Sequence, residues 1–277
     1  MGDLGRDTAV TKVDDGRYTA TLSDEWAIWG PMGGYIASTA LRAAGAESTF
    51  ARPASYFCQY LGVAQFDEIQ LTVTTLRAAR TALAQRVEVT QGDRRVLEAT
   101  VWSVGDVDGL EHDQAEAPSH PRPEELRPLT ELLSEEELAQ GPPFPFWRNL
   151  ESRTASFSRE PRPDGQPAVW REWERFVPTA TFEDPWIDAC RSLVLIDVQS
   201  WPAASRAHAW GHGFYAPSLD LYVAFADPQP GSEWLLCDGD GPVAKDGLMT
   251  WTGRLWSEAG RLVATGGGQL LCRRAPS

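Results

Sequence analysis

Apolar positions along this chain follow two patterns, and both patterns occur twice. Runs in which apolar and polar residues alternate are typical of half-buried strands, and they accompany one apolar segment of helical length in each half. The first half predicts a helix at 35–45 and strands at 17–22, 55–61, 68–77, 82–91 and 94–104. The second half predicts a helix at 186–201 and strands at 147–157, 168–177, 219–225, 233–240, 248–257 and 261–272. The chain therefore reads as one architecture built twice.

A shift of 165 residues superimposes the two predicted meanders. It places Glu68 on Glu233 and Ser55 on Asp220. The halves thus share an architecture but differ at this second position, where only Asp220 carries a carboxylate that could act in catalysis. We expect one half to carry the acid and the other to complete the pocket.

The residues around the two predicted helices indicate how these helices are used. Asp184 and Pro185 suit an N-cap and a first helical position, and the helix that follows is apolar nearly all round, which predicts burial on several sides. The first helix has small residues on most faces, and we expect it to stop at Gly45. We predict two halves side by side in one continuous sheet, with the helices that begin near Met32 and Asp184 at their centres.

The segment between the halves is acidic and rich in proline. From 106 to 141, eleven acidic residues stand against Arg122 and Arg127, so this segment carries −9 of the net charge of −14. Such a composition predicts a solvated linker, with a short surface helix at 124–139. The expected domains are 1–105, the linker 106–142, and 143–277. A basic stripe is missing, so we expect no nucleic-acid partner.

Cysteines, histidines and apolar runs narrow the class of protein further. The four cysteines are far apart in apolar segments, as is typical of reduced core thiols: Cys58, Cys190, Cys237 and Cys272. His208 and His212 have no carboxylate cluster that would complete a zinc site, so we expect no metal. No apolar run approaches 18 residues and the first residues lack a signal-peptide pattern, which favours a cytoplasmic protein without a membrane span.

A set of short motifs, in order and at matching spacing, resembles the TesB-like acyl-CoA thioesterase family over almost the whole chain outside the linker. The motifs are WGPMGGY at 29–35, LR at 76–77 with QRV at 85–87, PFPFWRN at 143–149, SLD at 218–220, EWLL at 233–236 and GRLVAT at 260–265. The resemblance implies an α+β tandem (double) hotdog, with an antiparallel sheet wrapped around a central helix in each half. It also implies hydrolysis of acyl thioesters carried by coenzyme A or by acyl carrier protein, with coenzyme A as part of the substrate and no cofactor. We further expect a homo-oligomer.

The resemblance also implies which residues act on water. Family members use an Asp that resembles Asp220, a hydroxyl residue and a Gln to hold the attacking water. Here Pro242 stands at the hydroxyl position and Gly268 at the Gln position, with Gln269 one residue later. On a regular strand Gln269 would point to the opposite face, whereas a bulge at 266–268 would re-aim it into the site. Asp220 and Gln269 are therefore the catalytic candidates.

Backbone N–H groups at the start of the first helix are candidate donors to the thioester oxygen. Gly33 and Gly34 let a ligand come close, and a helix N-terminus favours developing negative charge. A tight turn would require the same glycines. Met32 and Tyr35 flank the pair, and we expect all four residues to contact substrate, with Gly34 as the catalytic donor.

Two further sets of residues are substrate-binding candidates. Asp197 shares an apolar helix face, so its carboxylate must be functional or paired in a structural hydrogen bond. Arg77, Arg80 and Thr81 lie at a strand junction where relatives hold a hydrophilic loop. An arginine there suits coenzyme A phosphates, although an ordinary exposed surface explains these residues better.

Two other functions stay open at this point. A non-hydrolytic protein of the same fold would bind acyl thioesters or another apolar small molecule, because two of the three water-holding positions are altered. A hotdog hydratase or dehydratase would pair a His with the Asp, and no His adjoins the matched positions, so this function ranks third.

Overall fold

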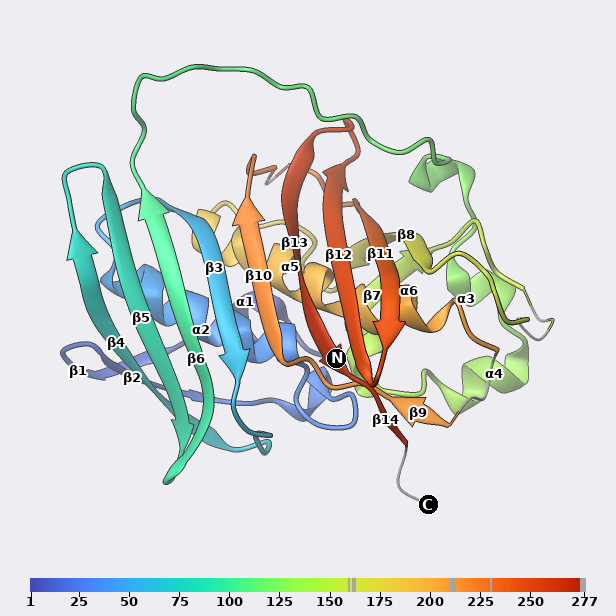
Figure 1. The fold of residues 1–277 in the computed structure, drawn as a ribbon, viewed down its shortest axis with the longest axis horizontal. Helices are drawn as coiled ribbons and strands as arrows, with labels where there is room; N and C mark the ends of the chain where they lie inside the picture. Colours follow the sequence, from blue (N-terminus) through green and yellow to red (C-terminus); the bar gives the residue numbers. More distant parts are fainter. Residues whose placement is uncertain (159, 161–162, 210–212, 230, 275–277) are drawn as a thin grey trace.

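One antiparallel sheet runs through the whole molecule (Figure 1). The computed structural model describes residues 1–158, 160, 163–209, 213–229 and 231–274. Twelve strands of this described part form the sheet, in the order β1-β2-β4-β5-β6-β3-β10-β13-β12-β11-β8-β7. Those of the first half are β1 (Thr11–Asp14), β2 (Arg17–Thr21), β3 (Arg52–Tyr60), β4 (Glu68–Ala78), β5 (Ala82–Gln91) and β6 (Arg94–Val104). Those of the second half are β7 (Leu150–Arg153), β8 (Val169–Phe176), β10 (Asp220–Phe225), β11 (Leu235–Lys245), β12 (Leu248–Ser257) and β13 (Leu262–Leu271).

The strand order is symmetric about its centre, where β3 pairs with β10. Reading outward from that pair, each strand of one half has a counterpart at the same place in the other half. Phe57 of β3 lies opposite Tyr222 of β10, and the shift of 165 residues places these two positions on each other. The predicted duplication in one continuous sheet is therefore confirmed, with a pseudo-twofold axis at the β3–β10 pair.

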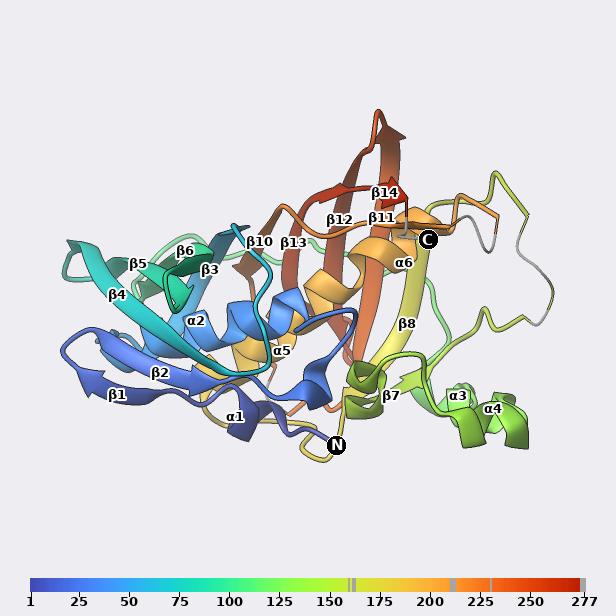
Figure 2. The same cartoon turned by 90° about the horizontal axis from the view of Figure 1, so that it is seen from below.

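Two helices fill the concave side of the sheet (Figure 2). They are α2 (Gly33–Glu47), with Met32 as N-cap, and α5 (Pro185–Val198), whose N-cap Asp184 accepts a hydrogen bond from the Trp186 N–H at 2.8 Å. Both helix starts agree with the prediction. Most of α5 is buried, as its apolar surface requires.

The predicted stop at Gly45 is wrong, because α2 continues to Glu47. A Cβ at Gly45 would lie 2.6 Å from Cδ2 of Trp186. Glycine at this position lets α5 approach α2, and the helix does not need it as a terminator. The second helix also differs: it ends at Val198, and a short helix α6 (Ser200–Ser205) follows. Pro202 lacks the N–H that a continuous helix would donate to the carbonyl of Val198.

The remaining elements are short. They are α1 (Leu4–Asp7), η1 (Asp24–Trp26), η2 (Pro123–Glu125), α3 (Leu129–Leu132), α4 (Glu135–Gln140), η3 (Pro145–Asn149), and the two-stranded pair β9 (Phe214–Tyr215) with β14 (Arg273–Arg274). Thus η3 and β7 replace the strand expected at 147–157, and α3 and α4 replace the single helix expected at 124–139. None of the helices among the described residues has the length and apolar character that crossing a bilayer requires.

The segment between the halves is solvated only in its first part. Residues 106–117 are exposed, and the chain crosses above the sheet from β6 to the far side of the second half (Figure 1). The carbonyl of Pro121 then accepts a hydrogen bond from Trp173 Nε1 at 2.8 Å, and the carbonyl of Pro123 accepts one from Arg153 Nη1 at 2.7 Å. These contacts attach the later part of the segment to β7 and β8, whereas the expected domain boundaries stay predictions.

Candidate active site

Four elements meet at one edge of the sheet, and they bring most of the candidate residues together. At this edge α2 and β10 begin, and β3 and β13 end. The Tyr60 N–H donates to the carbonyl of Leu219 at 2.9 Å, and the Leu219 N–H donates to the carbonyl of Gln269 at 2.8 Å. These bonds fasten β3, β10 and β13 to one another at the joint between the halves.

Asp197 reaches from α5 to the start of α2. Its Oδ2 accepts a hydrogen bond from the Gly34 N–H at 2.8 Å, and its Oδ1 accepts one from Ser218 Oγ at 3.2 Å. Burial raises the pKa of Asp197 to about 6, although both hydrogen bonds favour the charged form. The Gly34 N–H, expected to be a free oxyanion donor, is therefore already satisfied by a carboxylate, which corrects that prediction.

Close packing requires glycine at both positions that begin α2. A Cβ at Gly33 would lie 2.9 Å from both Asp197 Oδ2 and the Tyr60 hydroxyl. A Cβ at Gly34 would lie 2.8 Å from the carbonyl of Leu193. The pair thus allows α5 and β3 to approach α2, and no tight turn is needed to explain it.

Met32 and Tyr35 are core residues in this structure. Met32 is 2% exposed and Tyr35 is fully buried. The Tyr35 hydroxyl donates to the carbonyl of Asp7 at 2.9 Å, and its ring stacks on Trp26 with centroids 5.2 Å apart. The structure does not support the expectation that these two side chains contact substrate, because Tyr35 packs against the N-terminal segment and Met32 is buried in the core.

Asp220 begins β10 and is half-buried. Its Oδ1 accepts a hydrogen bond from the Gln269 N–H at 2.9 Å. A Cβ at Gly268 would lie 2.7 Å from that same oxygen and 2.5 Å from the carbonyl oxygen of Asp220. The carboxylate thus occupies the space in which a longer side chain at 268 would begin.

The pairing of β13 with β12 determines the direction of Gln269. The register is regular from Ala264 to Leu271, so the bulge considered for 266–268 is absent from this strand. Alternation then places the Gln269 side chain on the opposite face from Gly268. Gln269 serves Asp220 through its main-chain N–H. Pro242, in contrast, lies where the β11–β12 register shifts between Asp240 and Val243.

Arg77 and Thr81 lie at the opposite edge of the sheet. They belong to the hairpin between β4 and β5, and Ala82 pairs with Val104, which in turn pairs with Arg52 at the start of β3. Asp220 pairs with Gln59 at the other end of β3. The nine residues of β3 separate the two edges, so the structure does not bring this hairpin to the candidate site.

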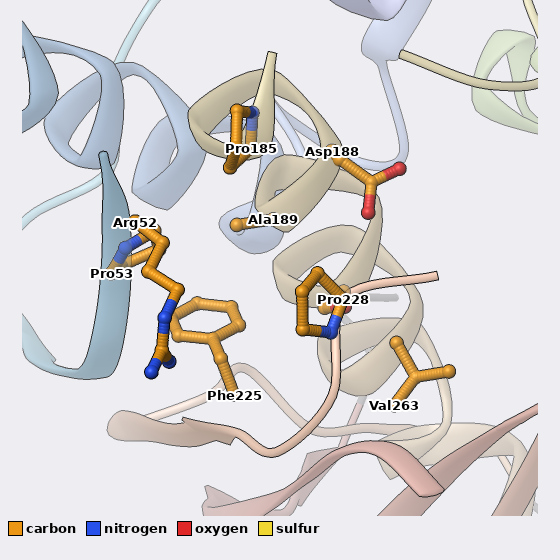
Figure 3. A pocket seen from close by; sticks show the side chains of 9 residues that line it. Arg52, Pro53, Pro185, Asp188, Ala189, Phe225, Pro228 and Val263 are labelled. Atoms are coloured by element: carbon orange, nitrogen blue, oxygen red, sulfur yellow. The ribbon is translucent and has the colours of Figure 1, made fainter. Parts of the chain in front are cut away.

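The matching joint at that opposite edge is nearly filled. Figure 3 shows a pocket there, between the start of α5, the start of β3 and the end of β10. The volume of this pocket is about 20 Å³. This volume holds about one water molecule. Asp188 is the carboxylate that lines this pocket, and it accepts a hydrogen bond from Arg191 Nε at 2.8 Å. The two joints therefore differ, and the carboxylates of Asp197 and Asp220 belong to the one at the start of α2.

The sequence did not single out Tyr60 and Ser218 as site residues, although Ser218 stands in the SLD motif at 218–220. Tyr60 alternates with Tyr56 and Cys58 along β3, which was the available signal. Burial raises the pKa of Tyr60 well above its usual value and the pKa of Cys58 to about 12, so both groups stay neutral.

The structure gives no metal centre among the residues it describes. No group of three or more His, Cys, Asp or Glu side chains in that part of the chain is placed to hold an ion. The four cysteines are free thiols. His212 lies outside the described residues.

Two models of known protein families match most of the chain. A family model described as the acyl-CoA thioesterase N-terminal domain matches residues 22–104, and one described as the acyl-CoA thioesterase C-terminal domain matches residues 118–270. The curated proteins give no match.

Solved structures align over nearly their full length. Acyl-CoA thioesterase II TesB2 from Mycobacterium marinum has a TM-score of 0.78 at 18% identity, with 99% of each chain covered. A conserved hotdog protein of unknown function from Alicyclobacillus acidocaldarius has a TM-score of 0.79 at 20% identity, with 99% of this chain and 98% of that chain covered. A candidate thioesterase from Novosphingobium aromaticivorans has a TM-score of 0.74 at 26% identity, with 95% of this chain and 98% of that chain covered. The double hotdog fold is thereby confirmed.

Proposed function

Since the chain belongs to the acyl-CoA thioesterase family, we propose that it hydrolyses acyl-CoA thioesters at the joint where α2, β3, β10 and β13 meet. The observation that carries this proposal is the position of Asp220. Its carboxylate is anchored by one oxygen to the main chain of β13, at the edge where α2 begins. Among the described residues, the other oxygen has no hydrogen-bond partner that would compete with water.

The proposed reaction needs one base and no cofactor. Asp220 takes a proton from a water molecule as the water oxygen attacks the thioester carbon. The carbon–sulfur bond then breaks, and the proton passes to the leaving thiolate, which gives a carboxylic acid and free coenzyme A. Asp197 is a positioning residue, because it holds the start of α2 at the joint through the Gly34 N–H.

The test is thiol release from acyl-CoA by the Asp220→Asn variant. Asparagine keeps an oxygen that accepts from the Gln269 N–H but cannot take the proton of water. We expect kcat to fall about 10²-fold or more, with little change in KM. Asp93→Asn, the same substitution at the exposed β5–β6 turn, is the matched control and should behave as wild type.

Gln269→Ala separates the roles of main chain and side chain. It keeps the N–H that holds Asp220, so we expect kcat within about threefold of wild type, far from the ~10²-fold scale of a lost base. If the wild-type protein binds acyl-CoA but releases no thiol, its function is binding and not hydrolysis. If Asp220→Asn is as active as wild type, Asp220 is not the base.

A further inference from the structure

A second pocket, of about 270 Å³, lies at the same edge of the sheet as Asp220. Its floor includes Met249, which is 3% exposed, and its walls include Trp201, Phe214, Leu248 and Cys272. Polar groups come mainly from the β11–β12 turn, where Lys245 and Asp246 lie, and from His208. A lining of this composition suits an apolar ligand with few polar groups.

The volume limits the size of that ligand. An apolar cavity of 150 Å³ holds benzene, so a pocket of about 270 Å³ holds about ten carbon atoms on the same scale. Phe214 and Leu248 are each 38% exposed in the free chain, and covering their surfaces would favour binding. The pocket thus fits part of an alkyl chain, and it is too small and too apolar for the phosphates of coenzyme A.

The strand register connects this pocket to the candidate active site. Met249 of β12 pairs with Leu270 of β13, and the neighbouring Gln269 donates its N–H to Asp220 of β10. Because β12, β13 and β10 are successive strands, the main chain at Met249 lies two strand spacings, or about 10 Å, from that at Asp220. A thioester at Asp220 can therefore extend its acyl chain past the end of β13 into the pocket.

We propose that this pocket binds the distal part of a long acyl chain, which assigns long-chain acyl thioesters as the substrate class. The inference rests on the proposed hydrolysis at Asp220. A short acyl group ends before the pocket and gains nothing from it, whereas a long one fills it. The rate constant kcat/KM should therefore rise with chain length until the pocket is full.

Ala244→Trp tests this proposal. Ala244 lines the pocket, is exposed, and pairs with Met249, so a tryptophan there fills the space without entering the core. For wild type we expect kcat/KM at least about tenfold higher with palmitoyl-CoA than with butyryl-CoA, since pocket contacts of a few methylenes discriminate on this scale. In Ala244→Trp this preference should be lost, with butyryl-CoA hydrolysis kept within about twofold.

Two further variants make the result specific. Thr252→Trp places the same side chain at an exposed position of the same hairpin outside the pocket, and it should keep the wild-type preference. Leu248→Gln changes the polarity of the wall instead of its volume, and it should weaken palmitoyl-CoA hydrolysis in the same direction as Ala244→Trp.

Binding of palmitate, measured by calorimetry on the full chain, distinguishes this inference from the proposed hydrolysis. We expect about tenfold weaker binding in Ala244→Trp and no change in Thr252→Trp. If wild type hydrolyses acyl-CoA and Ala244→Trp changes neither chain-length preference nor palmitate binding, the pocket assignment is overturned and the thioesterase stands. If no acyl-CoA is hydrolysed but Ala244→Trp still binds palmitate more weakly than wild type, the pocket assignment is supported and the proposed hydrolysis is wrong.

Discussion

At the scale of single residues, one carboxylate controls the start of α2. Asp197 is 6% exposed and is held by Gly34 and Ser218, two groups that donate hydrogen bonds but carry no positive charge. Burial chiefly raises the pKa of the Cys58 thiol, and the carboxylates of Asp197 and Asp220 both lie close enough to raise it further. The joint therefore contains two acids in different environments, and the buried one responds to pH near neutrality.

Asp197→Asn should change how stability depends on pH. The folded pKa of Asp197 is about 6 against a usual value of 3.8, so the unfolded chain gives up this proton first, and stability falls as pH rises from about 4 to about 6. The loss is on the order of 3 kcal/mol. Asparagine keeps an acceptor for Gly34 and has no such titration. Urea unfolding of both proteins at pH 4.5 and pH 7 measures the difference, and parallel pH profiles would contradict this account.

Gly268 shows how a single position constrains the site. The close approach of the Asp220 carboxylate leaves no space for a Cβ, so this chain cannot hold the family's glutamine there without moving Asp220. The glutamine side chain that the resemblance implies is thus missing at 268, and the Asp220 carboxylate is held instead by the main-chain N–H of Gln269.

At the scale of elements, β8 places two acids on its buried face. Glu172 and Glu174 are two residues apart and so point to the same side as Trp170 and Phe176. Glu174 Oε2 accepts a hydrogen bond from Ser152 Oγ at 2.7 Å, and its Oε1 has no partner among the described residues. Burial, with a further contribution from Glu172, raises the pKa of Glu174 well above its usual value.

Glu174→Gln should be more stable than wild type, and the difference in stability should grow as pH rises. A raised folded pKa means that wild type loses stability above the unfolded pKa of about 4.3, whereas glutamine stays neutral and can keep the bond to Ser152. We expect a higher Tm for the variant at pH 8, and a smaller difference at pH 5. Glu172→Gln is the matched comparison. In wild type Glu172 Oε1 lies 3.4 Å from Arg206 Nη2, so this substitution should raise the Tm by less. An equal Tm for Glu174→Gln and wild type at pH 8 would refute the argument.

At the scale of the whole molecule, the halves are joined without the linker. The β3–β10 ladder and the contact between α2 and α5 cross the boundary, whereas residues 106–117 are exposed. The segment from 121 onward is attached to the second half through Trp173 and Arg153. Cleavage should therefore be confined to the first part of the linker.

Limited proteolysis should cut within 106–117 and leave the halves together. Denaturing gels would show two fragments, and a sizing column without denaturant would show one species at the position of the intact chain. The same nicked sample in urea is the control, since its fragments should separate there. Two species on the native column would mean that the linker itself holds the halves in place.

The sequence alone determined the features that depend on local pattern. The strands 82–91 and 248–257 follow from periodicity, and the helix start at Asp184 follows from capping, which are both properties of consecutive residues. The duplication follows from the same patterns, because each half must bury its own apolar faces. Asp220 as the residue that differs between the halves was also visible, since the shift of 165 sets it against Ser55.

Only the tertiary structure decided which groups are available at the site. The Gly34 N–H is taken by Asp197, 163 residues away, and the direction of Gln269 depends on the register between β12 and β13. The hairpin with Arg77 lies at the wrong edge because β3 separates the two ends of the sheet. Hydrogen-bond partners and strand registers arise from contacts between distant segments, and no local pattern in the sequence specifies them.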